Sequence, residues 1–115
     1  MSFNDCITRG DIDGLSRLMT NDHVFIDSAN NTISGKARCI EAWSVFFGAF
    51  PDYRNHFERV MLAGSEAVII GYSVCSDIRL AGPALWTAKI KGELIAEWRV
   101  YEDTSANRAL LRVTD

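Results

Sequence analysis

The sequence predicts a single α+β domain in which helices come first and a sheet follows. Short helical segments and one long one occupy the first half of the chain, and long strand-like segments fill the second half. The length of 115 residues suits one domain over residues 1–115. A sheet of this size, bent strongly around the long helix, would form a cone-shaped α+β barrel. A small ligand could enter at the mouth of such a cone.

The helical segments follow from the spacing of the apolar residues. Residues 3–9 predict a short helix that ends at a glycine, and a second helix begins at Asp11 or Asp13. The main helix covers residues 36–50, where apolar side chains recur every three or four positions until Pro51 stops it. Its apolar stripe consists of Ala37, Ile40, Trp43, Phe46, Phe47 and Phe50.

The expected strands are rich in β-branched and aromatic residues and are separated by turn residues. They cover residues 23–27, 32–34, 53–62, 67–78, 85–91 and 95–103. A short helical segment over residues 106–112 closes the chain, with Thr104 or Ser105 as its cap. Because most of these strands are joined by short turns, the sheet is predicted to be antiparallel or mixed.

The composition argues against several classes of protein. With a net charge of −3 and scattered Lys and Arg, no basic surface for nucleic acid is expected. No stretch approaches the ~20 apolar residues of a membrane helix, and residues 1–6 do not resemble a signal peptide. Cys6, Cys39 and Cys75 form no CxxC pair, which is typical of reduced thiols in a cytoplasmic protein. No metal-ligand spacing or nucleotide-binding motif is present, so we expect no metal and no cofactor.

The last strand separates polar from apolar side chains. Residues 95, 97, 99, 101 and 103 share one face, which reads Ile, Glu, Arg, Tyr, Asp, and the opposite face is apolar until residue 102. The ordinary interpretation turns the apolar face to the core and the polar face to water. Because few segments remain to cover the sheet, we expect the polar face to line a pocket instead. The apolar face, with Leu94, Trp98 and Val100, would then meet a second subunit in a homodimer.

Several landmarks resemble the SnoaL-like branch of the nuclear transport factor 2-like superfamily, to which the ketosteroid isomerases belong. They are Gly10-Asp11, Asp22, Ser34-Gly35, Phe50-Pro51-Asp52 and the run from Ile95 to Asp103. The resemblance covers nearly the whole chain and implies the cone-shaped fold. The superfamily includes polyketide cyclases, isomerases, dehydratases, an epoxide hydrolase and proteins without catalysis, so the fold does not choose the chemistry.

Three residues are candidate acid or base groups. Asp27 matches the proton-abstracting carboxylate of the ketosteroid isomerases, and burial in an apolar cone would raise its pKa; otherwise it caps the turn at residues 30–31. Asp103 matches the acid or base of the SnoaL-type cyclases; otherwise it caps the closing segment. His56 is a candidate general base whose face of the strand is ambiguous, whereas His23 is expected to be exposed.

The other candidate site residues would bind the ligand. They are Trp43, Phe47, Trp86, Arg99 and Tyr101. Arg99 could hold a substrate anion or keep a carboxylate ionised, or it could form a structural ion pair. The resemblance places Phe3 and Trp86, or Thr87, where the ketosteroid isomerases carry their oxyanion-stabilising tyrosine and aspartic acid. Neither Phe3 nor Trp86 can replace those groups, so steroid isomerisation is not expected.

The sequence as a whole favours a homodimer that binds a small apolar or amphipathic molecule. Its carboxylates could isomerise, cyclise or dehydrate a carbonyl-containing substrate without a cofactor. The alternative is a non-catalytic ligand-binding or dimerisation module of the same fold.

Overall fold

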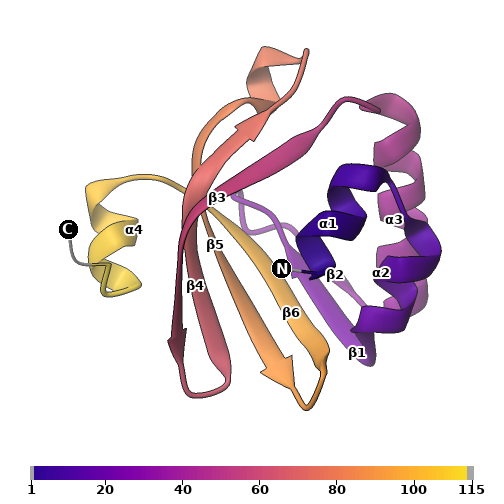
Figure 1. The fold of residues 1–115 in the computed structure, drawn as a ribbon, viewed down its shortest axis with the longest axis horizontal. Helices are drawn as coiled ribbons and strands as arrows, with labels where there is room; N and C mark the ends of the chain where they lie inside the picture. The colour runs from indigo at the N-terminus through magenta and orange to yellow at the C-terminus, as the bar shows by residue number, and fades with distance from the viewer. Residues whose placement is uncertain (1, 114–115) are drawn as a thin grey trace.

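The computed structural model describes residues 2–113 and confirms the α+β class. The elements are α1 (Ser2–Arg9), α2 (Ile12–Leu18), β1 (Met19–Ile26), β2 (Thr32–Ser34), α3 (Lys36–Ala49), β3 (Arg54–Ala63), β4 (Glu66–Val74), the 3₁₀ turn η1 (Ile78–Leu80), β5 (Gly82–Lys91), β6 (Leu94–Glu102) and α4 (Ser105–Leu110). Helices α1, α2 and α3 lie together on one side of a curved sheet, and α4 lies on the other side (Figure 1). We call the side that faces α1–α3 the inner face and the opposite side the outer face.

The sheet is mixed and open. Its six strands have the order β2-β1-β6-β5-β4-β3. Strands β1 and β6 are parallel, and the other neighbouring pairs are antiparallel. The parallel pair places the first strand beside the last, so residues far apart in the sequence meet at the centre of the sheet.

The sheet bends where strands carry an irregular register. The pairing of β3 with β4 shifts between Phe57 and Arg59, and a second shift interrupts the β5–β6 pair. At the first shift, a Cβ on Gly71 would collide with the carbonyl oxygen of His56, so only glycine allows the two backbones to approach this closely. Such bulges bend and twist a strand, and they account for part of the curvature that gives the cone its shape.

The main core fills the space between the helices and the inner face. Its most buried large side chains are Phe3, Ile7, Leu15, Met19, Ile69, Trp86 and Trp98. The ring of Trp98 packs against Phe3 of α1 at 4.8 Å between centroids and against Phe57 of β3 at 6.2 Å. Trp98 therefore joins the first helix to both the centre and the edge of the sheet.

The two faces of β6 are the reverse of the prediction. Trp98 is only 1% exposed, within one chain, so it cannot belong to an interface between two chains as expected. Val100 has the same parity and also faces inward, while Leu94 is half-buried. Arg99 and Tyr101 pair with the alternate positions of β5 and lie on the outer face. The physical reason is the ordinary one: the apolar face of the strand packs beneath the helices.

Strand β1 begins at Met19, earlier than predicted, because Met19 already pairs with Ile95 of β6; the register of this pair shifts before Val24. Residues 20–22 were expected to separate the second helix from the first strand, but they belong to the strand. The prediction that His23 is exposed is wrong: its side chain is 0% exposed. Its Nδ1 lies 2.6 Å from the carbonyl oxygen of Ile95, and the ring of Phe3 stacks on it at 5.8 Å. None of the helices within residues 2–113 is long and apolar enough to span a membrane.

Candidate functional site

A cavity of about 340 Å³ lies between α3 and the inner face of the sheet. Its lining is made up of Phe25, Asp27, Ser28, Ile33, Cys39, Ala42, Trp43, Phe46, Tyr53, Asn55, Leu80, Trp86, Trp98 and Val100. Most of these side chains are apolar, and six carry aromatic rings. Such a lining suits an apolar ligand.

The aromatic wall comes mainly from α3 and the strands next to it. Trp43 meets Phe25 of β1 edge to face at 5.6 Å and Phe46 of its own helix at 5.7 Å. Phe46 in turn meets the ring of Tyr53, just before β3, at 4.9 Å. Two residues of the predicted apolar stripe, Trp43 and Phe46, thus form part of the cavity wall. These edge-to-face contacts fix the rings in place.

The loop between β4 and β5 contributes Leu80 to the cavity, whereas Ile78 in the same loop is 85% exposed. Strand β4 ends at Val74, earlier than predicted, because residues 75–81 form this loop with η1 inside it. Asp77 caps η1: it accepts hydrogen bonds from the backbone N–H of Arg79 at 3.0 Å and from its guanidinium at 3.0 and 2.6 Å. The hydrogen bonds of the Arg79 side chain lower the pKa of Asp77 to about 2.

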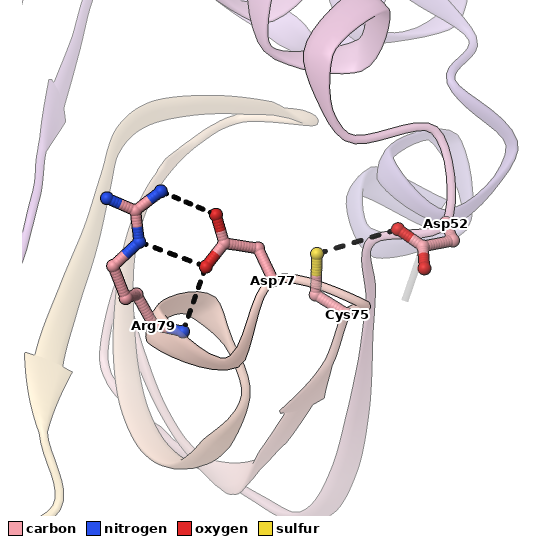
Figure 2. A network of polar contacts seen from close by, with 4 residues as sticks. All are labelled: Asp52, Cys75, Asp77 and Arg79. Carbon is pink, nitrogen blue, oxygen red and sulfur yellow. Dashed lines mark hydrogen bonds and ion pairs between the residues drawn. The ribbon is translucent and has the colours of Figure 1, made fainter.

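Asp52, in the turn after α3, holds this loop to the rest of the molecule. Its carboxylate accepts a hydrogen bond from the backbone N–H of Ser76 at 2.9 Å and a weaker one from the Cys75 thiol at 3.5 Å. Figure 2 shows the two parts of this network, with Asp52 reaching Cys75 from one side and the Asp77–Arg79 pair within the loop. The loop is therefore ordered internally by Asp77 and attached by Asp52.

Asp27 lies in the lining of the cavity, as predicted, but its carboxylate holds a turn. Its oxygens accept hydrogen bonds from the backbone N–H of Ala29, the backbone N–H of Asn31 and the amide of Asn31, all at 2.9 to 3.0 Å. Burial alone would raise the pKa of Asp27, but the hydrogen bonds from Asn31 and Ala29 outweigh it and lower the pKa. The expectation of a raised pKa is therefore wrong, and the turn-capping alternative is confirmed.

One polar corner interrupts the apolar lining, at the start of β3. Tyr53 Oη lies 3.2 Å from Ser73 Oγ, which donates a hydrogen bond of 2.7 Å to Asn55 Oδ1. Burial raises the pKa of Tyr53, and hydrogen bonds from Ser73 and Asn55 offset only part of that effect, so the phenol stays protonated at neutral pH. The backbone of Asn55 is also fixed, because its carbonyl oxygen accepts a hydrogen bond from the amide of Asn4 at 3.1 Å.

The sequence did not single out Tyr53 and Asn55. One signal could have found them: they share strand parity with Phe57, so a polar Asn55 sits between two aromatic residues on the face that turns inward. The partner Ser73 could not be found in this way. It is opposite Asn55 only through the register of β3 with β4.

Of the predicted site residues, the structure brings together Asp27, Trp43 and Trp86. Trp86 is fully buried and packs against Phe57 at 5.2 Å. Its indole nitrogen is sealed from solvent and has no hydrogen-bond partner among residues 2–113. Trp86 is therefore part of the cavity wall and does not present a donor to a ligand.

The structure places the other five predicted residues outside the lining. Asp103 forms a two-point ion pair with Arg108 of α4, at 2.6 and 2.9 Å, and the hydrogen bonds of Arg108 lower its pKa. Thr104, not Asp103, caps α4 by accepting from the N–H of Asn107. Phe47 stacks on Trp43 at 5.4 Å between ring centroids and packs against the core, but it does not line the cavity.

The outer face carries the remaining three of these five residues. His56 is exposed there and stacks on Tyr72 at 4.9 Å. Arg99 donates a hydrogen bond to Asn30 Oδ1 at 2.7 Å, and its guanidinium lies 4.7 Å from the ring centre of Tyr101. The predicted convergence of Asp27, Asp103 and His56 on one cavity is therefore not found.

A metal site is not evident in the part of the chain that the structure describes, where no three His, Cys, Asp or Glu side chains gather closely enough to hold an ion. The cysteines are free thiols, with Cys6 and Cys39 buried and Cys75 half-buried. Cys39 lies in the cavity wall, where its thiol donates weakly to backbone oxygens and burial raises its pKa.

Solved structures with the same fold include several with assigned or suggested activities. A candidate polyketide cyclase from Sinorhizobium meliloti has a TM-score of 0.77 and 18% sequence identity, over 86% of this chain and 89% of its own. An LEH-like epoxide hydrolase from M. tuberculosis has a TM-score of 0.77 and 16% identity, over 89% of this chain and 74% of its own. A protein with a ketosteroid isomerase-like fold from Catenulispora acidiphila, solved with trimethylamine, has a TM-score of 0.70 and 18% identity, over 94% of this chain and 87% of its own.

At these identities the structural likeness shows the fold alone. A search of functionally curated proteins found no match. The family model of the SnoaL-like domain matches residues 2–104, which is most of the chain. The protein therefore belongs to the SnoaL-like family.

Proposed function

We propose that the protein binds a small, largely apolar molecule in the cavity between α3 and the inner face. The observation that supports this most directly is the cavity itself, about 340 Å³ in volume and lined mostly by apolar and aromatic side chains. Ligand sites usually measure about 300–1,000 Å³ and combine apolar walls with a few placed polar groups. The Tyr53–Asn55 corner supplies such groups.

Proton transfer by Asp27 is the catalytic alternative, in line with the activities attached to some structural neighbours. Asp27 is the only carboxylate in the lining within the described residues. A general base works best when its pKa lies near the operating pH. The pKa of Asp27 is lowered and three hydrogen bonds occupy its oxygens, which makes it a weak base. The geometry thus supports binding better than catalysis.

Filling the cavity tests the proposal. Ala42 lines the cavity from α3, and Ala37 is exposed on the same helix. With 2-acetylnaphthalene as the probe, we expect Ala42→Phe to weaken binding by about tenfold or more, because the added ring competes for the space. Ala37→Phe should bind as wild type does. Isothermal titration calorimetry measures the affinities, and circular dichroism checks that both variants fold.

Two results would contradict the proposal. One is unchanged affinity in Ala42→Phe, which would place the probe elsewhere on the protein. The other is the absence of binding to wild type.

A further inference from the structure

The polar corner of the cavity is a closed ring of hydrogen bonds. Ser73 donates its single hydroxyl proton to Asn55 Oδ1 at 2.7 Å, so its oxygen accepts from Tyr53 Oη at 3.2 Å. The side-chain amide of Asn55 in turn donates to the phenol oxygen of Tyr53. Both hydroxyl protons and the amide are therefore engaged within the protein, whereas the oxygens at this corner retain lone pairs.

The other polar groups of the lining offer a ligand little to hold a negative atom. The Cys39 thiol donates weakly to the backbone oxygens of His23 and Ile33, at 3.7 and 3.4 Å. The indole nitrogen of Trp86 is sealed from solvent. An anionic ligand would lose its hydration in the cavity without gaining comparable donors, which is costly.

The formal charge in the lining is negative. Among the described residues, no lysine, arginine or histidine lines the cavity, and Asp27 is the one carboxylate that does. Burial alone would raise the pKa of Asp27, but the hydrogen bonds from Asn31 and Ala29, at 2.9 to 3.0 Å, lower it. The carboxylate is therefore ionised at neutral pH, so it repels an anion and attracts a cation.

Aromatic rings enclose the cavity from several directions. Trp43 stands at 70° to Phe25 and at 84° to Phe46, and Phe46 stands at 88° to Tyr53. Rings set nearly at right angles line a space on more than one side. Because the face of an aromatic ring is negative, such groups of rings form cages that bind quaternary ammonium ions.

We infer that the ligand carries a quaternary ammonium group, which the aromatic rings around Trp43 hold in the cavity while Asp27 supplies the opposite charge. This inference rests on the proposed binding function and specifies the ligand class for the same cavity. A primary ammonium is a poorer ligand, because its three N–H groups would lose their hydrogen bonds to water against mostly apolar walls. The methyl groups of a quaternary ammonium need no such partners and pack against the rings.

A matched pair of probes tests this in the wild-type protein. Benzyltrimethylammonium and neopentylbenzene have the same shape, but the second has a neutral carbon in place of the charged nitrogen. The hydrocarbon is the more hydrophobic of the two, so a cavity that is merely apolar would bind it more tightly. We expect the cation to bind about tenfold or more tightly than the hydrocarbon, as cation–π contacts do in a desolvated site. Isothermal titration calorimetry with the protein in the syringe measures both affinities, because the hydrocarbon is sparingly soluble.

Replacement of tryptophan by 5-fluorotryptophan tests the part played by the rings. The chain has three tryptophans, Trp43, Trp86 and Trp98, and all of them line the cavity. Fluorine withdraws electrons from the ring face and hardly changes its shape, so no mutation of the core is needed. We expect the substituted protein to bind benzyltrimethylammonium about twofold or more weakly and neopentylbenzene as before.

A pair of variants tests the part played by the carboxylate. Asp27→Asn removes the charge and keeps an oxygen for the backbone N–H groups of Ala29 and Asn31. We expect it to bind the cation about threefold or more weakly and the hydrocarbon as wild type does. Asp103→Asn is the matched control, because Asp103 lies outside the lining, and it should bind both probes as wild type does. If Asp27→Asn does not fold, the two probes in wild type and in the fluorotryptophan protein decide.

The outcomes separate this inference from the proposed function. Equal affinities of the two probes, or tighter binding of neopentylbenzene, would overturn the inference and leave binding in the cavity intact. Unchanged affinity for the cation in the fluorotryptophan protein or in folded Asp27→Asn would also overturn it, as would tighter binding of benzylammonium than of benzyltrimethylammonium. If neither probe binds but 2-acetylnaphthalene does, the inference fails alone. If none of the three binds to wild type, the proposed function fails as well.

Discussion

His23 is an ionisable side chain that the fold keeps neutral. Burial lowers its pKa below the ordinary value of 6.5, and the hydrogen bond to Ile95 with the nearby charges of Asp22 and Glu97 offsets only part of this effect. Its Nδ1 is paired with the Ile95 oxygen, whereas Nε2 is buried without a partner among residues 2–113. Protonation at Nε2 would place a charge between apolar rings.

This arrangement predicts a pH dependence of stability. Because the pKa of His23 is lower in the folded than in the unfolded chain, the unfolded chain binds more protons below pH 6.5. The free energy of unfolding should therefore be constant above about pH 6.5 and fall as the pH drops towards the folded pKa of His23. Urea denaturation between pH 5.5 and 7.5 measures the slope.

Two variants identify the group responsible for that slope. His23→Asn keeps a donor for the Ile95 oxygen but cannot titrate, so its unfolding free energy should be nearly flat over this range, though lower throughout. The chain has only two histidines. His56→Gln removes the exposed histidine and should keep the wild-type slope. A flat profile in His56→Gln would show that His56, and not His23, causes the pH dependence.

At the scale of the elements, β6 shows what the sequence can predict. The alternation of its side chains correctly separated two faces, one with Trp98 and Val100 and one with Arg99 and Tyr101. The direction of each face was wrong, because it depends on whether α1–α3 cover the sheet. Periodicity within one strand contains no information about its neighbours, and here the ordinary rule of apolar residues inward holds.

The polar corner lies beyond sequence-based prediction for a related reason. Tyr53 and Asn55 are close in the chain, but the hydrogen bonds that orient them come from Ser73, 18 positions after Asn55. Their meeting depends on the register of β3 with β4, and that register contains a shift. A shift of one residue would have turned Asn55 to the outer face. The apolar stripe on α3 needed no such information, so the buried position of Trp43 was predicted correctly.

The β4–β5 loop should have two separable attachments. Asp52 accepts from the N–H of Ser76, and Asp77 accepts from the N–H of Arg79. We expect Asp52→Ala to speed amide hydrogen exchange at Ser76 but not at Arg79, because only the attachment of the loop is lost. Asp77→Ala should do the opposite, since η1 loses its cap while Asp52 still holds the loop.

Each variant in this pair is the control for the other. Hydrogen exchange followed by NMR gives the rate at each amide. Equal acceleration at Ser76 and Arg79 in both variants would show that the loop opens as one unit and that the two attachments are not independent.

At the scale of the whole molecule, the order of elements was enough to predict the α+β class, and the landmarks were enough to predict the family. The cavity was predicted only in outline, because its volume arises from packing between α3 and strands distant in sequence. The homodimer stays a prediction, but the surface predicted for it is not available, because Trp98 is buried in the core of one chain. The outer face leaves Tyr72 and Val74 each 40% exposed, beside the exposed His56. Light scattering of the wild-type protein would establish whether two chains associate.

A substitution at Trp98 tests whether this residue lies in an interface between two subunits or in the core of one chain. If its row met a second subunit, Trp98→Glu would give a folded monomer. In the structure, Trp98 is 1% exposed and touches both Phe3 and Phe57, so the variant buries an unpaired carboxylate at the centre of the core. Burying such a charge costs several kcal/mol, comparable to the total stability of about 5–15 kcal/mol of a small domain.

We therefore expect Trp98→Glu to lose its cooperative unfolding transition in urea. Val74→Glu, on the outer face, is the matched control and should unfold cooperatively because its carboxylate remains in water. Circular dichroism and light scattering on the same samples separate unfolding from dissociation. A Trp98→Glu protein that is monomeric and retains a cooperative transition close to that of Val74→Glu would mean that Trp98 does not hold α1 to the sheet.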